Sequence, residues 1–366
     1  MTAVSWDERV ELADRFSPRL VLFPEVEALG RPKVSGGAGD YHPRSINLLV
    51  DGGRFYPGTL RALLSLNFKI MFDYTARPPV TLEALEHGRG FDQIRVMGPP
   101  IPSPDAAWQK YFALLNAVDH TQRSGRERYP VTTYARVVTR AEALAASQND
   151  DYDKSQIGWP FYTFDSLRDD DVAVQYWFCY FFDDWYNIHE GDWEGVCVFL
   201  RRAGADWQPL GATYYAHENG SRRHWADLER DGDHPVVYVA SGSHASYFQF
   251  LPNGHKTSIS GTFLPGLRLK MRIKVDSERY DFVPDRARHP LVTPRVEVLL
   301  NPAQPGIHQH SVWQQQKWLA FPGSWGAREL GRFIAGGPTG PAAKGLKWLN
   351  PFAWSEAECW PDYQVY

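Results

Sequence analysis

The sequence has few cysteines and no excess of positive charge. Its 366 residues include only Cys179, Cys197 and Cys359, and the formal net charge is -4 at pH 7. Three scattered cysteines cannot form a disulfide framework or a thiolate zinc site. A nucleic-acid-binding domain usually shows a strongly basic surface, so we expect no nucleic-acid partner.

Long apolar segments are also missing. No run approaches the roughly 20 apolar residues that span a bilayer, so no transmembrane segment is predicted. The first residues, MTAVSWDERVELADRF, are acidic and lack the apolar centre of a secretory signal peptide. We therefore expect a soluble protein, cytoplasmic by default, for which a peripheral membrane contact stays open. Phosphate-binding loops, dinucleotide fingerprints and nucleophile elbows are absent from the sequence.

Apolar and aromatic residues, in contrast, are abundant. Hydrophobic residues make up 43% of the chain, and it contains 14 Trp, 18 Tyr and 20 Phe, most of which we expect to anchor a core. A chain of this length can bury a large core as one elaborated domain. We predict one domain over residues 1–366, with a helical insertion at 57–126, a β core that carries the site at 131–300 and a packed Trp-rich tail at 336–366.

The spacing of apolar residues changes along the chain. After the helix-start signal at Ser103, the residues Trp108, Tyr111 and Leu115 recur at helical spacing. From Val131 onward, short apolar runs follow one another without helices between them, which is typical of antiparallel sheets. The pattern predicts a mainly β fold, an antiparallel β-sandwich with helical insertions in the N-terminal half.

One stretch combines the most apolar and the most polar segments. Residues 172–200 read VAVQYWFCYFFDDWYNIHEGDWEGVCVFL, which predicts two paired strands at 172–182 and 193–200 joined by a polar loop. Cys179 and Cys197 lie in these strands, and we interpret both as small buried hydrophobic residues.

The polar loop predicts a divalent-cation site formed by Asp184, His189, Asp192 and Glu194. Alternation along a strand places Asp192 and Glu194 on one face, and His189 in the loop can fold back over it. An oxygen-rich set with one imidazole favours magnesium, calcium or manganese over zinc. The alternative is a structural role, in which these carboxylates pair with cations such as those at 222–223.

A second polar segment, from His217 to Tyr247, supplies His217 and His244. Either histidine would move the preference toward zinc, manganese or iron, and either is a candidate general base. Two classes of function are therefore open. In the first, the cation binds a polar headgroup, sugar or phosphate of a small-molecule, lipid or glycan ligand. In the second, the protein is a metal-dependent enzyme of the hydrolase type that uses a metal-activated water.

For the binding protein, the aromatic residues that we expect to cover the ligand are Trp185, Tyr186 and Trp225. A catalytic site should leave a coordination position open to water beside an acid or base, whereas a recognition site should open onto an aromatic shelf. We favour the binding protein over the enzyme.

Several motifs resemble the vacuolar protein sorting-associated protein 62 family. They are YWFCYFFDDWYNIHEGDWEGV, HPVVYVASGSHASYF, RFSPRLVLFPE near the start, and WLAFPGSWGA, GPTGP and NPFAW toward the end. The resemblance covers most of the chain and is weakest between 51 and 126. The name of that family reflects a genetic association, so the resemblance implies no biochemical activity.

The hexapeptide HEGDWE is similar to the His-x-x-Asp-Trp-Glu core of the necrosis-inducing, NLP-type cytolysins. That resemblance implies a β-sandwich that holds a divalent cation and engages sphingolipid headgroups. His189, Asp192 and Glu194 match the core, Asp184 matches the preceding strand-end aspartate, and His244 matches the later histidine. The chain departs from the family at Gly191, in its greater length and in lacking a visible secretion signal. These departures leave the cation site in place and argue against an extracellular toxin.

Overall fold

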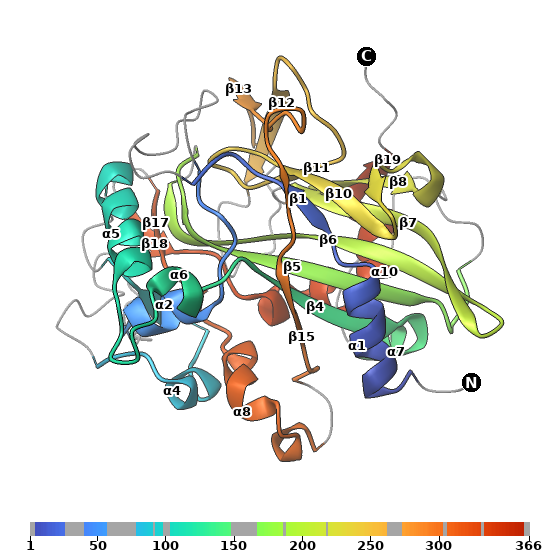
Figure 1. Cartoon of the computed structure of the whole chain (residues 1–366), viewed down its shortest axis with the longest axis horizontal. Coiled ribbons are helices and arrows are strands. Elements are labelled where there is room, and N and C mark those ends of the chain that lie inside the picture. Colours follow the sequence, from blue (N-terminus) through green and yellow to red (C-terminus); the bar gives the residue numbers. More distant parts are fainter. Residues whose placement is uncertain are drawn as a thin grey trace.

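The two apolar runs expected as strands pair with each other at the centre of a nine-stranded sheet (Figure 1). They are β5 (Val172–Asp183) and β6 (His189–Ala203), and they run antiparallel. Three further antiparallel strands flank them: β4 (Thr132–Thr139) beside β5, then β7 (Asp206–Ala216) and β8 (Asn219–His224) beyond β6. The computed structural model describes residues 4–25, 40–56, 78–90, 92–97, 103–147, 167–185, 188–216, 219–261, 273–302, 306–330 and 333–361.

Both faces of this sheet are covered, because all twelve residues of β5 are buried. On one face, the hydroxyl of Tyr176 donates to the carbonyl of Ala13 at 3.0 Å, in helix α1 (Trp6–Arg15). On the other face, the amide of Gln175 donates to the carbonyl of Lys347 at 2.7 Å, in α9 (Leu346–Leu349). Neighbouring side chains of a strand point to opposite faces, so the sheet lies between an N-terminal and a C-terminal layer.

A second sheet lies on the α1 side. Its order is β11 (Ser246–Tyr247), β10 (His234–Val239), β1 (Arg19–Val21) and β14 (Leu291–Val292), with β9 (Arg230–Asp231) pairing β10. The hydroxyl of Tyr214 in β7 donates to the carbonyl of Val236 at 2.9 Å, and its ring stacks on Phe248 at 3.9 Å. This packing brings the turn between β10 and β11 close to the central hairpin.

The other elements surround these two sheets. The remaining strands are β2 (Arg54–Tyr56), β3 (Gln93–Arg95), β12 (His255–Gly261), β13 (Ile273–Asp281), β15 (Arg295–Val298), β16 (Ser324–Trp325), β17 (Ala327–Leu330), β18 (Phe333–Gly336) and β19 (Cys359–Pro361). The remaining helices are α2 (Asn47–Gly52), α4 (Leu82–Glu86), α5 (Pro104–Asn116), α6 (Gly125–Arg128), α7 (Arg140–Ala146), α8 (Trp313–Gln316) and α10 (Pro351–Glu358). Single 3-10 turns are η4 (Trp225–Asp227), η5 (Ile307–Gln309), η6 (Lys317–Ala320) and η7 (Pro341–Ala343).

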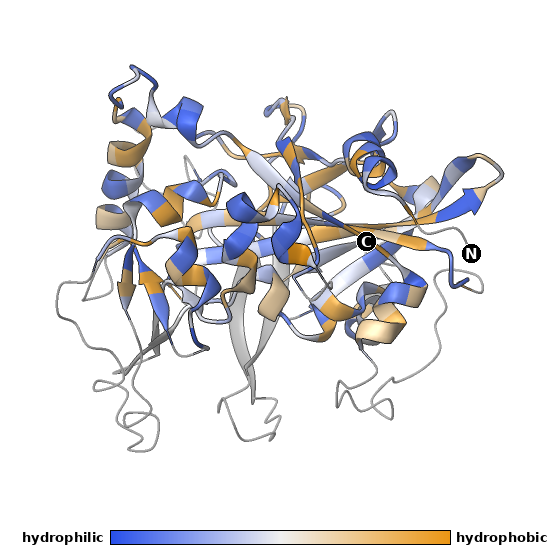
Figure 2. Ribbon diagram, turned by 90° about the horizontal axis from the view of Figure 1, so that it is seen from below, coloured by the Kyte–Doolittle hydropathy of each residue, from blue (hydrophilic) through white to orange (hydrophobic). Residues whose placement is uncertain are grey.

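The expected antiparallel sandwich is found only in part. Among the strands that the structure describes, four pairs are parallel: β1 with β10, β15 with β4, β16 with β3, and β19 with β8. Each parallel pair joins segments that lie far apart in the sequence, whereas the alternation read from the sequence reports only local pairing. The sheets are therefore mixed, and apolar strands in Figure 2 run between the helical layers.

Helices are also not confined to the first half. The helices α8, α9 and α10 follow residue 300. In the tail, Trp348, Phe352 and Trp354 are buried against the body. The part of the expected helical insertion at 57–77 lies outside the described residues; within 78–126 the structure has α4, α5 and α6 but also strand β3.

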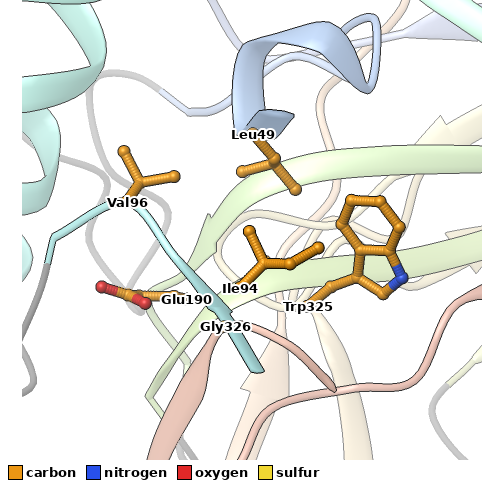
Figure 3. A pocket seen from close by; sticks show the side chains of 7 residues that line it. Leu49, Ile94, Val96, Glu190, Trp325 and Gly326 are labelled. Atoms are coloured by element: carbon orange, nitrogen blue, oxygen red, sulfur yellow. The ribbon is translucent and has the colours of Figure 1, made fainter. Parts of the chain in front are cut away.

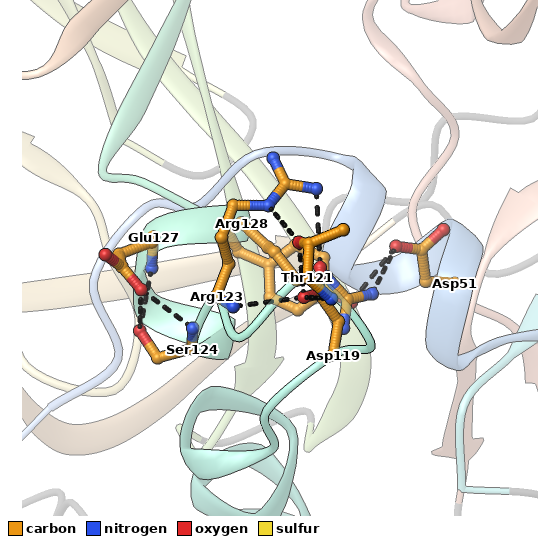
Figure 4. Close-up of polar contacts among 8 residues, drawn as sticks. Asp51, Asp119, Thr121, Arg123, Ser124, Glu127 and Arg128 are labelled. Atoms are coloured by element: carbon orange, nitrogen blue, oxygen red, sulfur yellow. Dashed lines mark hydrogen bonds and ion pairs between the residues drawn. The ribbon is translucent and has the colours of Figure 1, made fainter.

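The connection between α5 and α6 shows how local side chains set the helix ends (Figure 4). The Asp119 carboxylate accepts from the backbone N–H groups of Thr121 and Arg123 at 2.8 and 3.0 Å. Hydrogen bonds from the Thr121 side chain and these backbone groups hold the pKa of Asp119 well below its usual range. Ser124 and Glu127 then form a reciprocal capping box that starts α6.

The three cysteines are free thiols, and all three are buried. Burial raises the pKa of Cys179 and Cys197 well above the ordinary value for a thiol. Both therefore pack as apolar side chains, as expected from their place in the two strands. Among the described helices, each is too short or too polar to cross a membrane.

A buried ion-pair network joins the end of the β1 segment to α5. The Glu25 carboxylate accepts hydrogen bonds from Arg44 and Tyr111 and, at 2.8 Å, from Arg126. Burial opposes ionisation of Glu25, but His42, Arg44 and the hydrogen bonds outweigh it and lower its pKa. The side chains of Glu25 and Arg44 are 4% and 6% exposed, so each depends on the other for its charge balance.

We expect Glu25→Gln to lower the free energy of unfolding by about 3–5 kcal/mol, because it leaves the Arg44 charge buried without its partner. Because the pKa is lowered on folding, this stabilisation is complete above pH ~4 and is lost as the pH falls through the folded value. The control is Glu83→Gln, which breaks an exposed pair with Lys317 and should cost less than about 1 kcal/mol. Urea unfolding at pH 7 and at about pH 3 measures both variants. The difference between Glu25→Gln and the wild type should shrink at the lower pH, and equal losses for the two variants at pH 7 would contradict the prediction.

Candidate metal centre

The centre is built at the open end of the β5–β6 hairpin. Asp183, the last residue of β5, pairs in register with His189, the first residue of β6, and Tyr180 pairs with Asp192. The ladder therefore continues to His189, which lies in the strand and not in the loop as the sequence suggested. Only residues 184–188 remain as the connection.

Gly191 brings His189 and Asp192 to the same side of β6. In a regular strand, residues three apart point to opposite faces. Gly191 has φ +66, a left-handed conformation that interrupts the alternation. As a result, Glu190 and Trp193 both lie against Trp325, while the ligand atoms of His189 and Asp192 lie within 4.8 Å of each other.

The group consists of Asp183, His189 and Asp192. Each offers one ligand atom, and these atoms lie within 4.8 Å of one another. The three residues are between 4% and 6% exposed, so the group is buried. Two carboxylates and one imidazole in such an arrangement are a donor set for a divalent cation.

The hydrogen bonds of His189 define which ring nitrogen carries the proton. Nδ1 lies 2.6 Å from the carbonyl oxygen of Gly191, which can only accept, so Nδ1 is the donor. Nε2 lies 3.4 Å from Oδ2 of Asp183. In neutral His189 this nitrogen has a lone pair that faces a carboxylate, and only a second proton or a cation between them relieves that repulsion. Metal-bound histidines typically donate their other N–H to a carbonyl or carboxylate in this way.

The two carboxylates of the group differ in their electrostatics. Burial raises the pKa of Asp183 to about 6, with His189 opposing and Asp192 adding to the rise. Burial acts in the same direction on Asp192, but the hydrogen bond from His244 and the charges around it outweigh burial and lower the pKa. Asp192 is therefore the more readily ionised of the two carboxylates. Ionisation of Asp183 is unfavourable because its carboxylate is buried.

His244 contacts the group from the turn after β10. Its Nδ1 lies 3.0 Å from Oδ2 of Asp192 and its Nε2 lies 3.5 Å from Oδ1 of Asp40. The ring stacks on Tyr180, with 3.9 Å between centroids and 6° between planes. Burial opposes the charged form of His244, but the two carboxylates raise its pKa to about 10. His244 is therefore held as an imidazolium, with both nitrogens directed at carboxylates.

The structure brings together two of the four ligands expected from the sequence, His189 and Asp192, and adds Asp183. Within the described residues, Asp184 and Glu194 are buried but are not members of the group. Asp183 could have been identified from the register of the two paired strands, since it is the aspartate directly opposite His189. Asp40 was also missed, because no local pattern links it to this hairpin.

The other sequence-predicted residues lie as follows. Trp185 is buried, and its backbone N–H donates to Oδ1 of Asp183 at 2.7 Å. Trp225 packs edge-on against Phe16 and directly follows His224, which pairs with Gly211 in the middle of β7. Gly211 pairs with Phe199 of β6, so at 3.3 Å per strand residue Trp225 lies about 20 Å along β6 from Asp192. Tyr186 and His217 lie outside the described residues.

Glu190 lines a small cavity on the opposite side of β6 (Figure 3). Its carboxylate accepts from the backbone N–H of Met97 at 3.1 Å, and Nε of Arg95 lies 3.6 Å away. Burial raises the pKa of Glu190 to about 7, and Arg95 offsets part of that rise. Leu49, Ile94 and Val96 make the cavity mainly apolar. Glu190 therefore belongs to the packing between β6 and β3, not to the cation group.

A second cluster of possible ligands is Glu83, Glu86 and His87, at the surface. Glu86 already has cationic and hydrogen-bonding partners, with Nζ of Lys317 at 2.9 Å and the indole N–H of Trp313 at 2.8 Å. Lys317 supplies the positive charge that a metal would supply there. Among the described residues, the buried group at the hairpin is the stronger candidate.

Fold and site together define a sheet-rich protein with a buried aspartate–histidine–aspartate group that could hold a metal ion. No protein-family model and no curated protein matches the chain, so membership of the vacuolar protein sorting-associated protein 62 family is not shown. Among solved structures, the chain is distantly similar to Necrosis and Ethylene inducing Protein 2 from the causal agent of cocoa's Witches Broom disease. The TM-score is 0.26 at 16% identity, over 65% of this chain and 67% of that one. A TM-score this low does not establish a shared fold or a shared function.

Proposed function

We propose that the protein binds one divalent cation through Asp183, His189 and Asp192 and recognises a polar ligand through that ion. The observation that carries this proposal is Nε2 of His189, which faces the Asp183 carboxylate at 3.4 Å while Nδ1 donates to the Gly191 carbonyl. A divalent cation between them replaces a repulsion by two coordination bonds. The donor set favours magnesium, calcium or manganese over zinc.

The charge balance around the group supports a cation. Asp40, Asp183 and Asp192 are buried, and the imidazolium of His244 offsets only part of their negative charge. Buried charges are ordinarily paired or coordinate a metal. A divalent ion offsets the remaining charge at the position where the carboxylates and His189 converge.

Three protein ligands leave about half of the coordination positions of such an ion open, since magnesium and calcium take about six or more ligands. Oxygen atoms of a headgroup, a sugar or a phosphate can occupy those positions. Binding is favoured over hydrolysis because both ring nitrogens of His244 are directed at carboxylates, which leaves no lone pair to accept a proton from water. The roles of Trp185, Tyr186 and Trp225 as ligand-covering residues, the role of His217, and a cytoplasmic location remain predictions.

The test is a titration of the purified protein with Mn²⁺, followed by calorimetry and by the electron paramagnetic resonance signal of the free ion. We expect one ion per chain, and Asp183→Asn should weaken binding by about 100-fold or more, beyond the loss typical of an outer partner. Asp184→Asn is the matched control, since it changes the neighbouring buried aspartate and should leave the Kd within about threefold. A wild type that binds no Mn²⁺, Ca²⁺, Mg²⁺ or Zn²⁺ would refute the proposal. If only Asp184→Asn abolished binding, the ligands would be those predicted from the sequence: Asp184, His189, Asp192 and Glu194.

A further inference from the structure

Asp40 lies at the start of a chain of contacts that ends at the cation group. Asp40 is 3% exposed, and two backbone N–H groups donate to its carboxylate. The N–H of Tyr41 donates to Oδ1 at 2.8 Å, and the N–H of Gly242 donates to Oδ2 at 2.9 Å. Gly242 is 202 residues away in the sequence, so this contact joins the N-terminal segment to the β10–β11 turn. Asp40 is thereby fixed in position by main-chain atoms of two segments.

His244 is the next link. Its backbone has φ +56, and its N–H donates to the carbonyl of Ala240 at 3.1 Å, which closes the turn. The ring lies between the carboxylates of Asp40 and Asp192 and stacks on Tyr180. A left-handed backbone in a residue other than glycine is uncommon and persists where surrounding contacts hold it. Both the backbone and the ring of His244 are therefore held in one orientation.

Asp192 is the last link. Oδ1 accepts from the backbone N–H of Trp193 at 2.8 Å, and Oδ2 accepts from Nδ1 of His244 at 3.0 Å. A carboxylate held at both oxygens cannot rotate, yet each oxygen keeps a second lone pair for a cation. This restraint presets Asp192 for the position between Asp183 and His189.

We infer that Asp40 is a positioning residue of the cation site, which acts through His244 to fix the orientation of the Asp192 carboxylate. The inference rests on the proposed cation site and extends it, because Asp40 touches neither the ion nor its three ligands directly. Partners that orient a metal ligand typically change metal affinity by about 10–100-fold when they are removed. Asp40 and His244 have the geometry of such partners.

The experiment measures the Kd for Mn²⁺ in the full chain. We expect Asp40→Asn to raise the Kd by about 10-fold and His244→Phe, which keeps an aromatic ring on Tyr180 but removes the donor to Asp192, by about 100-fold. His244→Asn keeps an N–H donor near the Nδ1 position but has no second nitrogen to reach Asp40, so it should recover the affinity only to about the level of Asp40→Asn. In the His244→Phe background, Asp40→Asn should have no further effect, because Asp40 acts through the His244 ring.

The matched control is Asp171→Asn. Asp171 is also a fully buried aspartate, paired with Arg201 at 2.7 Å at the other end of β5. Its loss should destabilise the protein without changing the Kd. If Asp40→Asn does not fold, Tyr180→Leu removes the surface on which His244 stacks and should raise the Kd through the same link.

The possible results separate the inference from the site. If the wild type binds Mn²⁺ and Asp40→Asn has an unchanged Kd, the positioning role is overturned and the cation site is not. The same holds for an unchanged Kd in Tyr180→Leu, where that variant replaces Asp40→Asn. Equal weakening in Asp40→Asn and Asp171→Asn, or additive effects of Asp40→Asn and His244→Phe, would show a general loss of stability instead. A wild type that binds no cation would overturn the proposed function and this inference with it.

Discussion

Replacing Gly191 with alanine is expected to abolish cation binding and to lower the free energy of unfolding by about 2–5 kcal/mol. Two costs add. The left-handed backbone, φ +66, costs a residue with a side chain about 1–2 kcal/mol. A Cβ at this position would also lie 2.2 Å from the carbonyl oxygen of Trp325, and overpacking of this kind costs about 1–3 kcal/mol.

Trp325 cannot easily move away from the added methyl group. The residue is 1% exposed, its N–H donates to the carbonyl of Pro338 at 2.8 Å, and its ring packs on Trp193 and Trp318. The strain is therefore relieved in β6, where a return to regular alternation turns His189 and Asp192 to opposite faces. Cation binding is lost because its ligands separate, even where the chain still folds.

Gly204→Ala is the matched control for this experiment. Gly204 has φ +67, nearly the same backbone conformation, but nothing lies within 4 Å of a Cβ placed there. It should cost about 1–2 kcal/mol and leave the Kd for Mn²⁺ unchanged. Urea unfolding and the Mn²⁺ titration measure both variants, and wild-type affinity in Gly191→Ala would show that the interrupted alternation is not needed for the site.

The second large effect is the response of stability to metal. An ion that binds only the folded state at a free concentration a thousand times its Kd adds about 4 kcal/mol to the free energy of unfolding. We expect a chelator to remove this stabilisation from the wild type and to lower its Tm. Asp183→Asn and Asp192→Asn should both remove the response to added Mn²⁺.

The two variants should differ in the chelated state. The raised pKa of Asp183 means that the folded protein binds more protons there than the unfolded chain, so metal-free stability falls as the pH rises from about 4 to about 6. Asp183→Asn removes that fall and should stabilise the metal-free protein by about 1–3 kcal/mol at pH 8. Asp192→Asn should destabilise it, because His244 loses a charged partner.

The two-residue spacing of Asp192 and Glu194 in the sequence suggests the opposite effect of Asp192→Asn on metal-free stability. Spacing alone sets Asp192 against Glu194 as repelling neighbours, so removal of the Asp192 charge would relieve the metal-free state. The positive charge of His244 balances the Asp192 carboxylate. The unfavourable buried charge in the metal-free protein is therefore that of Asp183. Thermal melts in chelator at pH 4.5 and pH 8 decide between the two, and a stabilised Asp192→Asn would contradict the role given to His244.

The sequence by itself determined the central hairpin and two members of the candidate metal group, His189 and Asp192. The run of β-branched and aromatic residues around Cys179 and Cys197 is too apolar for any exposed strand, so pairing at the centre of a sheet follows from burial alone. The clustering of His189 and Asp192 at the end of that hairpin follows from chain order. These features depend on local pattern, which a sequence carries directly.

Tertiary structure decided the rest. The choice of Asp183 over Asp184 depends on strand register, and a one-residue change in register sends a side chain to the other face. The side on which Asp192 points depends on the left-handed conformation of Gly191, where the Trp325 carbonyl leaves no room for a Cβ. The positioning proposed for Asp40 and His244 depends on two segments that meet only when both sheets are in place. Asp40 and Gly242, which form the contact between them, lie 202 residues apart in the sequence. Local alternation contains no information on such contacts, because their partners are selected by the packing of the whole chain.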